Sequence, residues 1–337
     1  SSDLTYIADA EVISEGIRYF GYSAYCYLFC GLSLIGSNIL RSVGQVKIPL
    51  YTAILAFFAN VGFNYIFIFG KLGFPAMGVV GAALGTLLAR ILEFGITFGY
   101  LLLADKSIQY KLKDILLRSK HLNKEFMKVA LPVMISDTLQ GFGNNVIAMI
   151  TGRIGSQFVA AFSITAVIQQ MSSVLTQGVA QSSSIVVGHT LGSGDAKRAR
   201  EEADAFVGLG IVVGVVAGVV ILLVSGPIIS CYNITKATEM IARQLMWAIA
   251  FIVFFRSINS ILTKGVLRGG GDTRFLMVAD IIFLWAASVP LGYVVGVVFK
   301  APAFWTYCAL RIDEILKCIL CFYRLRGGKW IKNISAR

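Results

Sequence analysis

The sequence predicts an all-α polytopic membrane protein. Of its 337 residues, 57% are hydrophobic and only 14% are charged. A soluble globular domain has about 45–50% apolar residues and about 25% charged ones. The apolar residues also form long runs, and about 20 such residues in a helix cross the hydrocarbon core of a bilayer. This composition excludes a soluble enzyme, a disordered tail and a nucleic-acid-binding domain.

Nine apolar runs are long enough to be transmembrane helices. Transmembrane barrel strands have about ten residues of alternating polarity, whereas these runs are about twice as long and apolar on all sides. Helices also satisfy their own backbone hydrogen bonds in lipid. The predicted spans are 17–38, 48–69, 77–103, 130–150, 158–188, 206–226, 240–263, 276–298 and 303–323.

The basic residues fall mainly on one side of these spans. The loops of the other side hold only Lys71, Arg153, Lys236 and Lys300. Because cytoplasmic loops carry an excess of Lys and Arg, the pattern predicts a cytoplasmic C-terminus. The basic loops contain 20 Lys and Arg in all and are 39–50, 104–130, 189–205, 264–275 and 324–337.

An internal repeat relates two of the basic loops. The segment ILRSVGQVK at 39–47 matches VLRGGGDTR at 266–274 with an offset of 227 residues. Shifting the last three spans back by this offset places them on the first three. A parallel repeat of this kind is one of the internal symmetries of secondary transporters; the alternative is a chance similarity between Gly- and Arg-rich loops.

The repeat leaves the three middle spans, from 130 to 226, without partners. We therefore expect a complete protein of twelve helices in two pseudo-symmetric six-helix lobes, with three further spans upstream of residue 1. The predicted organisation is the remainder of a first lobe (1–103), a cytoplasmic linker (104–129), a complete second lobe (130–323) and a basic cytoplasmic tail (324–337).

Three spans of the second lobe each carry a stripe of polar side chains, and polar groups inside a membrane usually have a function. Residues three, four or seven apart share one face of a helix. We expect the stripes to line a shared water-filled cavity; direct hydrogen bonds between helices without a cavity are the alternative. The stripes are Asp137, Gln140 and Asn144; Gln170, Ser173, Gln177, Gln181 and Ser184; and Arg256, Asn259, Ser260 and Thr263.

Other ionisable residues have the spacing of ion pairs within one helix. Arg90 and Glu93 are three residues apart, and Asp280 lies near the cytoplasmic end of its span; all three are structural or coupling candidates. In the last span, Asp313 can pair with Lys317, and Arg311 with Glu314, in structural ion pairs. Cys318 and Cys321 form a CxxC without a second Cys pair or a His cluster, which favours two buried thiols over a metal or redox site.

No motif for ATP use or for catalysis is visible. The segment LRGGGDTR lacks the GK[ST] ending of a phosphate-binding loop and follows a helix rather than a strand. HExxH and GxSxG are absent from the sequence. We predict a protein that is not an enzyme, has no cofactor or metal site, and draws its energy from an H⁺ or Na⁺ gradient.

Four segments together resemble the multidrug and toxic compound extrusion (MATE) family, and its bacterial branch in particular. They are RSVGQVKIP, FNYIFIFGKLGFPAMGVVGAALGT, VGHTLGSGDAKRA and VLRGGGDTR, and the similarity runs from about residue 11 to the end. The resemblance implies two lobes, a central cavity open to one side at a time, and export of drugs or organic cations in exchange for Na⁺ or H⁺. It also implies a bacterial inner membrane location.

The family's functional residues match this sequence unevenly. Some members have a Glu about eight positions after a Leu-Pro in the second lobe, where this sequence has Gln140, with Asp137 one turn earlier. Those members also have an Asp at the position that Ser257 occupies here. Other members carry the coupling Asp in the first helix of the first lobe, which we expect upstream of residue 1. The differences favour this second type.

The leading hypothesis is an ion-coupled efflux antiporter for small, cationic molecules, with Asp137 as one candidate for the exchanged proton. The alternative in the same superfamily is a flippase or exporter of a lipid-linked or oligosaccharide precursor, in which several Arg would face the cavity. A membrane enzyme or a scaffold is a third, weaker hypothesis. We expect membrane lipids and small molecules as partners, no nucleic acid, and no requirement for an oligomer.

Overall fold

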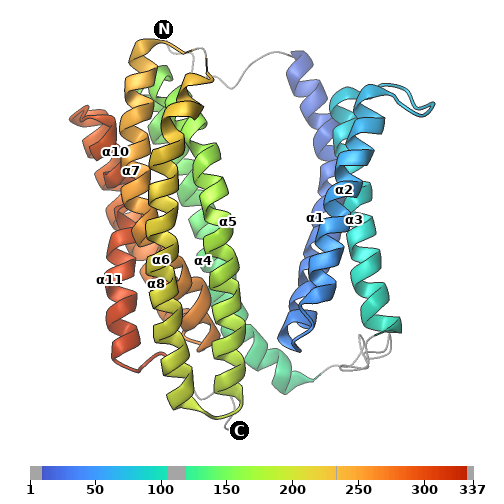
Figure 1. The fold of residues 1–337 in the computed structure, drawn as a ribbon, viewed down its shortest axis with the longest axis vertical. Helices are drawn as coiled ribbons and strands as arrows, with labels where there is room; N and C mark the ends of the chain where they lie inside the picture. The colour runs from blue at the N-terminus through green and yellow to red at the C-terminus, as the bar shows by residue number, and fades with distance from the viewer. Residues whose placement is uncertain (1–9, 105–118, 233, 332–337) are drawn as a thin grey trace. The chain divides into compact units, whose positions relative to one another are not determined.

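The computed structural model describes residues 10–104, 119–232 and 234–331, and every element in these ranges is helical. The chain divides into two compact units, Ser1–Arg118 and Ser119–Arg337. Helices α1 to α3 belong to the first unit and α4 to α11 to the second (Figure 1). Most of the predicted 104–129 linker, residues 105–118, lies outside the described residues.

The first unit consists of α1 (Ala10–Ser42), α2 (Lys47–Phe69) and α3 (Gly78–Leu103). Both α1 and α2 pack against α3. Gly81 and Gly85 of α3 lie against the α2 backbone, where an added Cβ atom would overlap it. Small residues allow this close approach of two helices, which favours packing inside a membrane.

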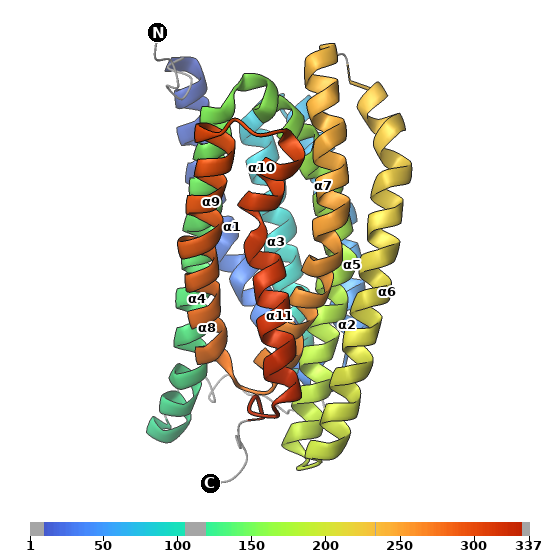
Figure 2. The same ribbon diagram turned by 90° about the vertical axis from the view of Figure 1, so that its left-hand side faces the viewer.

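The second unit is a larger bundle in which α8 and α9 run alongside α4, and α11 runs alongside α7 (Figure 2). Each of the helices α4, α6 and α7 begins with a side-chain cap, in which Ser119, Asp195 or Thr235 accepts a backbone N–H. Its elements are α4 (Lys120–Ile154), α5 (Ser156–Gly192), α6 (Ala196–Ser230), α7 (Lys236–Ser260), η2 (Ile261–Leu267), α8 (Thr273–Ile281), η3 (Ile282–Ser288), α9 (Val289–Tyr293), η4 (Val294–Val298), α10 (Ala303–Leu310) and α11 (Ile312–Arg326).

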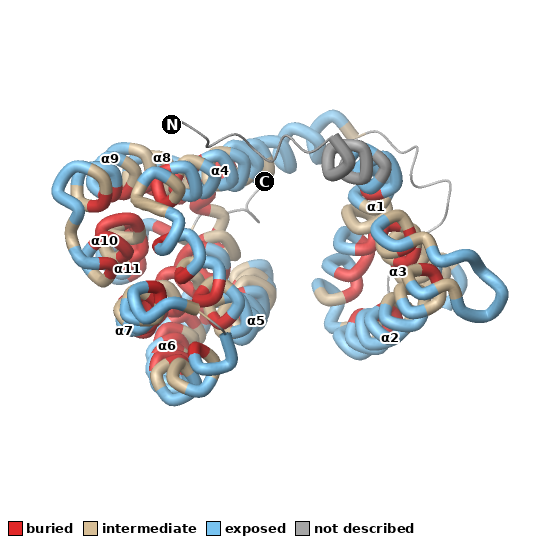
Figure 3. Tube along the Cα trace, turned by 90° about the horizontal axis from the view of Figure 1, so that it is seen from above, coloured by how far each residue is buried: buried red, intermediate tan, exposed pale blue. Residues whose placement is uncertain are grey.

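Helix α7 is the best-buried helix of this unit. Gly214 and Gly218 of α6 face it, with Cβ positions 3.0 and 3.1 Å from the carbonyl oxygens of Phe254 and Ala250. The main apolar core surrounds α7 and includes α10 and part of α5. Figure 3 shows buried residues on α7, α10 and α11, while the outward faces of the bundle are exposed. Exposed apolar faces of this kind suit a bundle surrounded by lipid.

Two membrane helices contain π-helical turns. The seven residues of η2 continue α7, so that the helix runs from Lys236 to Leu267. The helix therefore extends four residues past the predicted end at residue 263, and Lys264, expected in a loop, lies inside it. Turns of the π type are frequent at functional sites.

The two repeat loops have the same backbone geometry. Gly44 and Gly271 both have φ of +80°, a left-handed conformation that favours glycine. The N–H of Gly44 donates to the Arg41 carbonyl at 3.0 Å, and that of Gly271 to the Arg268 carbonyl at 3.1 Å. The next residue in each loop donates to the carbonyl four residues before the glycine, Leu40 or Leu267. The offset of 227 thus relates two turns of the same shape.

Helices occupy all nine predicted runs, but they are not equally clear as spans. Seven are long and apolar enough to cross a membrane, and the chain is a multi-pass membrane protein. The runs at 130–150, within α4, and 303–323, which breaks between α10 and α11 at Arg311, fall outside those seven. The count of nine and the inferred total of twelve stay predictions.

Candidate functional site

A charged cavity lies inside the second unit, between α4, α7–η2, α8 and α11. Its volume is about 60 Å³, which is room for a few water molecules at about 15 Å³ each. Leu276 is its apolar lining residue. The charged lining residues are three carboxylates, Asp137, Asp280 and Glu314, and four cations, Arg256, Lys264, Arg268 and Lys317.

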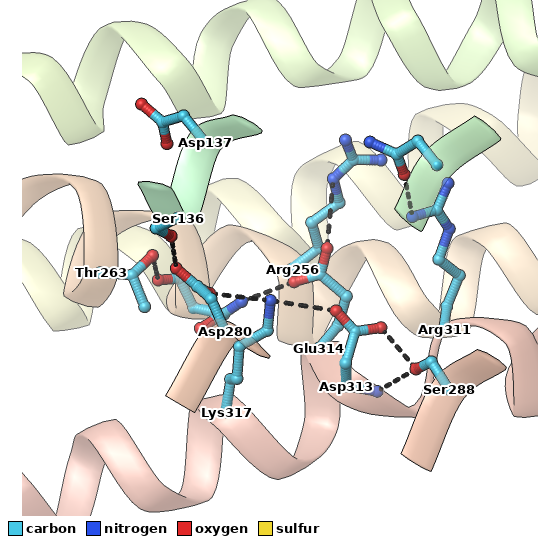
Figure 4. Close-up of polar contacts among 12 residues, drawn as sticks. Ser136, Asp137, Arg256, Thr263, Asp280, Ser288, Arg311, Asp313, Glu314 and Lys317 are labelled. Carbon is cyan, nitrogen blue, oxygen red and sulfur yellow. Dashed lines mark hydrogen bonds and ion pairs between the residues drawn. The ribbon is translucent and has the colours of Figure 1, made fainter. Parts of the chain in front are cut away.

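Lys317 of α11 is the centre of a buried ion triad (Figure 4). Its Nζ atom lies 3.2 Å from Asp280 Oδ1 of α8 and 3.0 Å from Asp313 Oδ2, one turn earlier on α11. The Lys317 side chain is only 2% exposed. Ser136 donates to Asp280 at 2.6 Å and Ser288 to Asp313 at 2.8 Å. Each carboxylate thus has a cation and a hydroxyl, as a buried charge requires.

Glu314 of α11 connects the triad to α7. Asn259 Nδ2 donates to Glu314 Oε2 at 2.6 Å, and Arg256 Nε lies 3.8 Å from Glu314 Oε1. The Arg256 contact is too long for a hydrogen bond, so its guanidinium is held mainly by charge. Asp313, Glu314 and Lys317 are all buried. They lie where α11 packs against α7, α8 and η3.

Helix α4 contributes two further polar contacts. Asp137 accepts from Arg268 at 3.3 Å, and its side chain is 52% exposed. Asn144, two turns later, accepts from Arg311 Nη1 at 3.0 Å. Both contacts join α4 to the second half of the bundle, and Arg268 and Arg311 each keep a buried Nε atom without a hydrogen-bond partner among the described residues.

A second cavity of about 30 Å³ lies between α5 and α7–η2. Helix α5 lines it with Gln169, Ser173, Thr176 and Gln177. It shares three side chains with the larger cavity, namely Arg256, Ser260 and Lys264.

The structure brings together part of the predicted site. Of the α4 and α7 stripes, Asp137, Gln140, Arg256 and Asn259 all line the larger cavity. Asn144 contacts Arg311 instead. On α5, Gln177 lines the smaller cavity, whereas Gln170 and Gln181 line neither of the two.

The remaining predicted residues are in ion pairs. Asp280, expected near a cytoplasmic end, belongs to the Lys317 triad. Arg90 and Glu93 pair at 2.5 Å inside the first unit. The expected pair of Arg311 with Glu314 was wrong, because these two side chains turn to Asn144 and to α7, respectively.

Sequence reasoning missed Glu314, Lys317, Lys264 and Arg268 as site residues. Glu314 and Lys317 were assigned to intrahelical pairs because the spacing along one helix says nothing of the neighbouring helix. Lys264 and Arg268 were assigned to a loop because a charged residue marks the end of an apolar run. The available signal was the i, i+4, i+8 spacing of Arg256, Ser260 and Lys264.

Comparison with known proteins agrees with this architecture. A sequence model of the MatE family matches residues 4–66 and 132–294. The chain belongs to the MATE family of transporters. A probable multidrug resistance protein NorM from Thermotoga maritima is 27% identical over 325 residues, which are 96% of this chain and 69% of the relative. A probable multidrug resistance protein NorM from Photorhabdus laumondii is 28% identical over 313 residues, which are 89% of this chain and 69% of that relative.

Solved MATE structures share the fold. A crystal structure of MATE in the straight conformation has a TM-score of 0.84 at 17% identity, covering 95% of this chain and 72% of that one. The outward-facing conformation of a multidrug resistance MATE family transporter of the MOP superfamily also gives 0.84 at 17% identity, with 96% and 72% covered. The membrane-protein fold expected from the sequence is thus that of a transporter family.

Proposed function

We propose that this MATE-family chain exports small organic molecules by alternating access, in exchange for inward H⁺ or Na⁺. The observation that carries the proposal is the charged cavity inside an otherwise apolar helical bundle. Charged side chains inside a membrane are costly and mark transport pathways and proton relays. The relatives named as multidrug resistance proteins support small-molecule export.

The coupling step is proposed to be a change of ion-pair partners. Asp137, Asp280 and Glu314 all face the cavity, and each has a cation within 4 Å. A carboxylate that loses its cation inside a membrane gains a proton or a Na⁺, because a bare charge is unstable there. Movement of α11 relative to α8 would separate Lys317 from Asp280 and thus connect ion binding to a conformational change.

Asp137 is the most accessible carboxylate of the three. Its partner is Arg268 rather than Arg256, which lies on the same cavity. Ion pairs between partly exposed side chains contribute little free energy, so the pair of Asp137 with Arg268 separates at low cost. We propose that Asp137 takes part in exchange, with Gln140 as a hydrogen-bonding residue beside it.

The flippase hypothesis gains from the structure. Besides Arg256, the cavity is lined by Lys264 and Arg268, and cations of this kind bind phosphate groups. The family's multidrug-resistance relatives still favour drug-like substrates. The proposed setting is a bacterial inner membrane with a cytoplasmic C-terminus.

Whole-cell efflux tests the proposal. Cells without their own exporters, expressing the full-length protein, should accumulate less of a fluorescent drug than cells with an empty vector. Each ion gradient is then collapsed in turn. Accumulation equal to the vector control, at matched membrane expression, would refute the proposal.

A further inference from the structure

The smaller cavity, between α5 and α7–η2, is lined by cations and hydrogen-bond donors. No Asp or Glu is among the described residues that line it. Its two charged side chains are Arg256 and Lys264, and its hydroxyls include Ser173 and Ser260. The larger cavity, which Arg256 and Lys264 also line, contains the carboxylates of Asp137, Asp280 and Glu314.

The lining follows a matched pattern on the two helices. On α7–η2, Arg256, Ser260 and Lys264 are four residues apart. On α5, Ser173 and Gln177 have the same spacing. Residues four apart share one helix face, so one face of α5 meets one face of α7–η2 along two turns.

Helix η2 packs closely on α5 next to this cavity. The carbonyl oxygen of Ala180 lies 2.8 Å from the position that a Cβ atom on Gly265 would take. The carbonyl oxygen of Ser184 likewise lies 2.8 Å from the position that a Cβ atom on Gly269 would take. The glycine next to Lys264 therefore allows the η2 backbone to approach α5 closely.

Lys264 has no direct salt-bridge partner among the described residues, and the carboxylates of Glu314 and Asp137 act on it from beyond salt-bridge distance. It makes no ion pair and no hydrogen bond with any residue that the structure describes. Arg256 is only loosely paired, at 3.8 Å from Glu314. Two cations on one small cavity within a membrane repel each other and attract an anion.

We infer that this cavity binds the oxyanion group, a carboxylate or a phosphate, of the transported molecule. This inference rests on the proposed function and names its substrate class, anionic or zwitterionic molecules instead of cations alone. A volume of about 30 Å³ holds about two water-sized groups. It therefore suits the oxygens of an oxyanion, while the rest of the molecule extends into the larger cavity, which shares Arg256, Ser260 and Lys264.

The contacts would divide between charge and hydrogen bonds. The Arg256 guanidinium can donate two parallel hydrogen bonds to a carboxylate, and Lys264 supplies a point charge. Ser173, Ser260 and the Gln177 amide can donate from both helices. Binding would thus join α5 to α7–η2.

Binding to the purified full-length protein in lipid nanodiscs tests the inference without requiring transport. The probes are benzoate, the neutral isostere benzamide, and benzylammonium. Benzoate should bind at least about tenfold more tightly than either of the others, a ratio expected for a charge-assisted contact. Equal or tighter binding of benzamide or benzylammonium would overturn the inference.

Variants locate the site. Lys264→Gln should weaken benzoate binding about tenfold, whereas Lys264→Arg should retain most of the affinity. Ser173→Val, on the opposite helix, should weaken benzoate binding about two- to fivefold, because one neutral hydrogen-bond donor is lost. Lys236→Gln, outside the cavity, is the matched control and should bind as the parent does. Unchanged binding in Lys264→Gln would contradict the assignment, and Ser173→Val provides a second reading if that variant folds poorly.

A final comparison distinguishes the source of the oxyanion. Farnesyl phosphate and inorganic phosphate are titrated beside benzoate. Tightest binding of farnesyl phosphate, lost in Lys264→Gln, supports the site with a lipid-linked ligand, and tightest binding of benzoate supports it with a soluble one. A protein that binds benzoate and exports nothing would refute the proposed function and leave this inference standing.

Discussion

Lys317 offers the sharpest test of the buried network. In Lys317→Met the carboxylates of Asp280 and Asp313 lose the ammonium that lies 3.2 and 3.0 Å from them. Among the described residues, Ser136 and Ser288 then remain as their side-chain hydrogen-bond donors. Removing one partner of a buried ion pair costs about 3–5 kcal/mol, because the remaining charge stays buried.

The matched control is an exposed pair of the same spacing. Arg243 and Glu239 are also four residues apart and 2.8 Å from each other, but their side chains are 61% and 39% exposed. Such pairs contribute about 0–1 kcal/mol. Arg243→Met should therefore change the free energy of unfolding by less than about 1 kcal/mol.

The assay is reversible unfolding in mixed detergent micelles, followed by tryptophan fluorescence. The double variant Lys317→Met/Asp313→Asn should recover part of the loss, since only one bare carboxylate remains; couplings between contacting residues are about 0.5–3 kcal/mol. The reasoning is refuted if Lys317→Met loses no more stability than Arg243→Met, or if the double variant is less stable than the single one.

Three further predictions address other parts of the account. Asp137→Asn in the full-length protein should lower efflux and flatten its pH dependence at unchanged expression, whereas unchanged efflux would give Asp137 a structural role. On a Cys-free background, Lys120→Cys should resist membrane-impermeant thiol reagents in intact cells and Lys236→Cys should react; the reverse pattern would invert the predicted orientation. Gly44→Ala should lower the free energy of unfolding by about 1–2 kcal/mol, because an L side chain is strained at φ +80°. The control Gly62→Ala lies inside α2 with open space around it and should raise the free energy of unfolding by about 0.5–1 kcal/mol. Equal effects of the two variants would refute the role of the turn.

The sequence predicted the helices well because length and apolarity alone define them. The turn at Gly44 and its repeat at Gly271 were also predictable, since three identical residues at one offset recur in the same backbone geometry. The end of the helix after α7 was not, because Lys264 is charged and still lies within it. A charge inside a membrane is tolerated where it faces a cavity, and single-helix patterns do not show cavities.

The same reason separates the site residues that the sequence predicted from those that it did not. Asp137, Gln140, Arg256 and Asn259 were found because polar residues stood out on apolar faces. Glu314 was not, because an intrahelical partner explained it equally well. Its true partner, Asn259, lies 55 residues earlier on another helix, and only the packing of α11 against α7 brings the two together.

Transport by everted membrane vesicles tests the central claim, ion-coupled export, most directly. Vesicles that contain the full-length protein are given a fluorescent substrate. Because the membrane is everted, export by the protein is measured as uptake of the substrate into the vesicles. The H⁺ gradient is collapsed with a protonophore and the Na⁺ gradient with monensin, in separate experiments at constant ATP. The account predicts that uptake stops when one of these gradients is removed. Uptake that persists without both gradients, or that follows ATP alone, would contradict it.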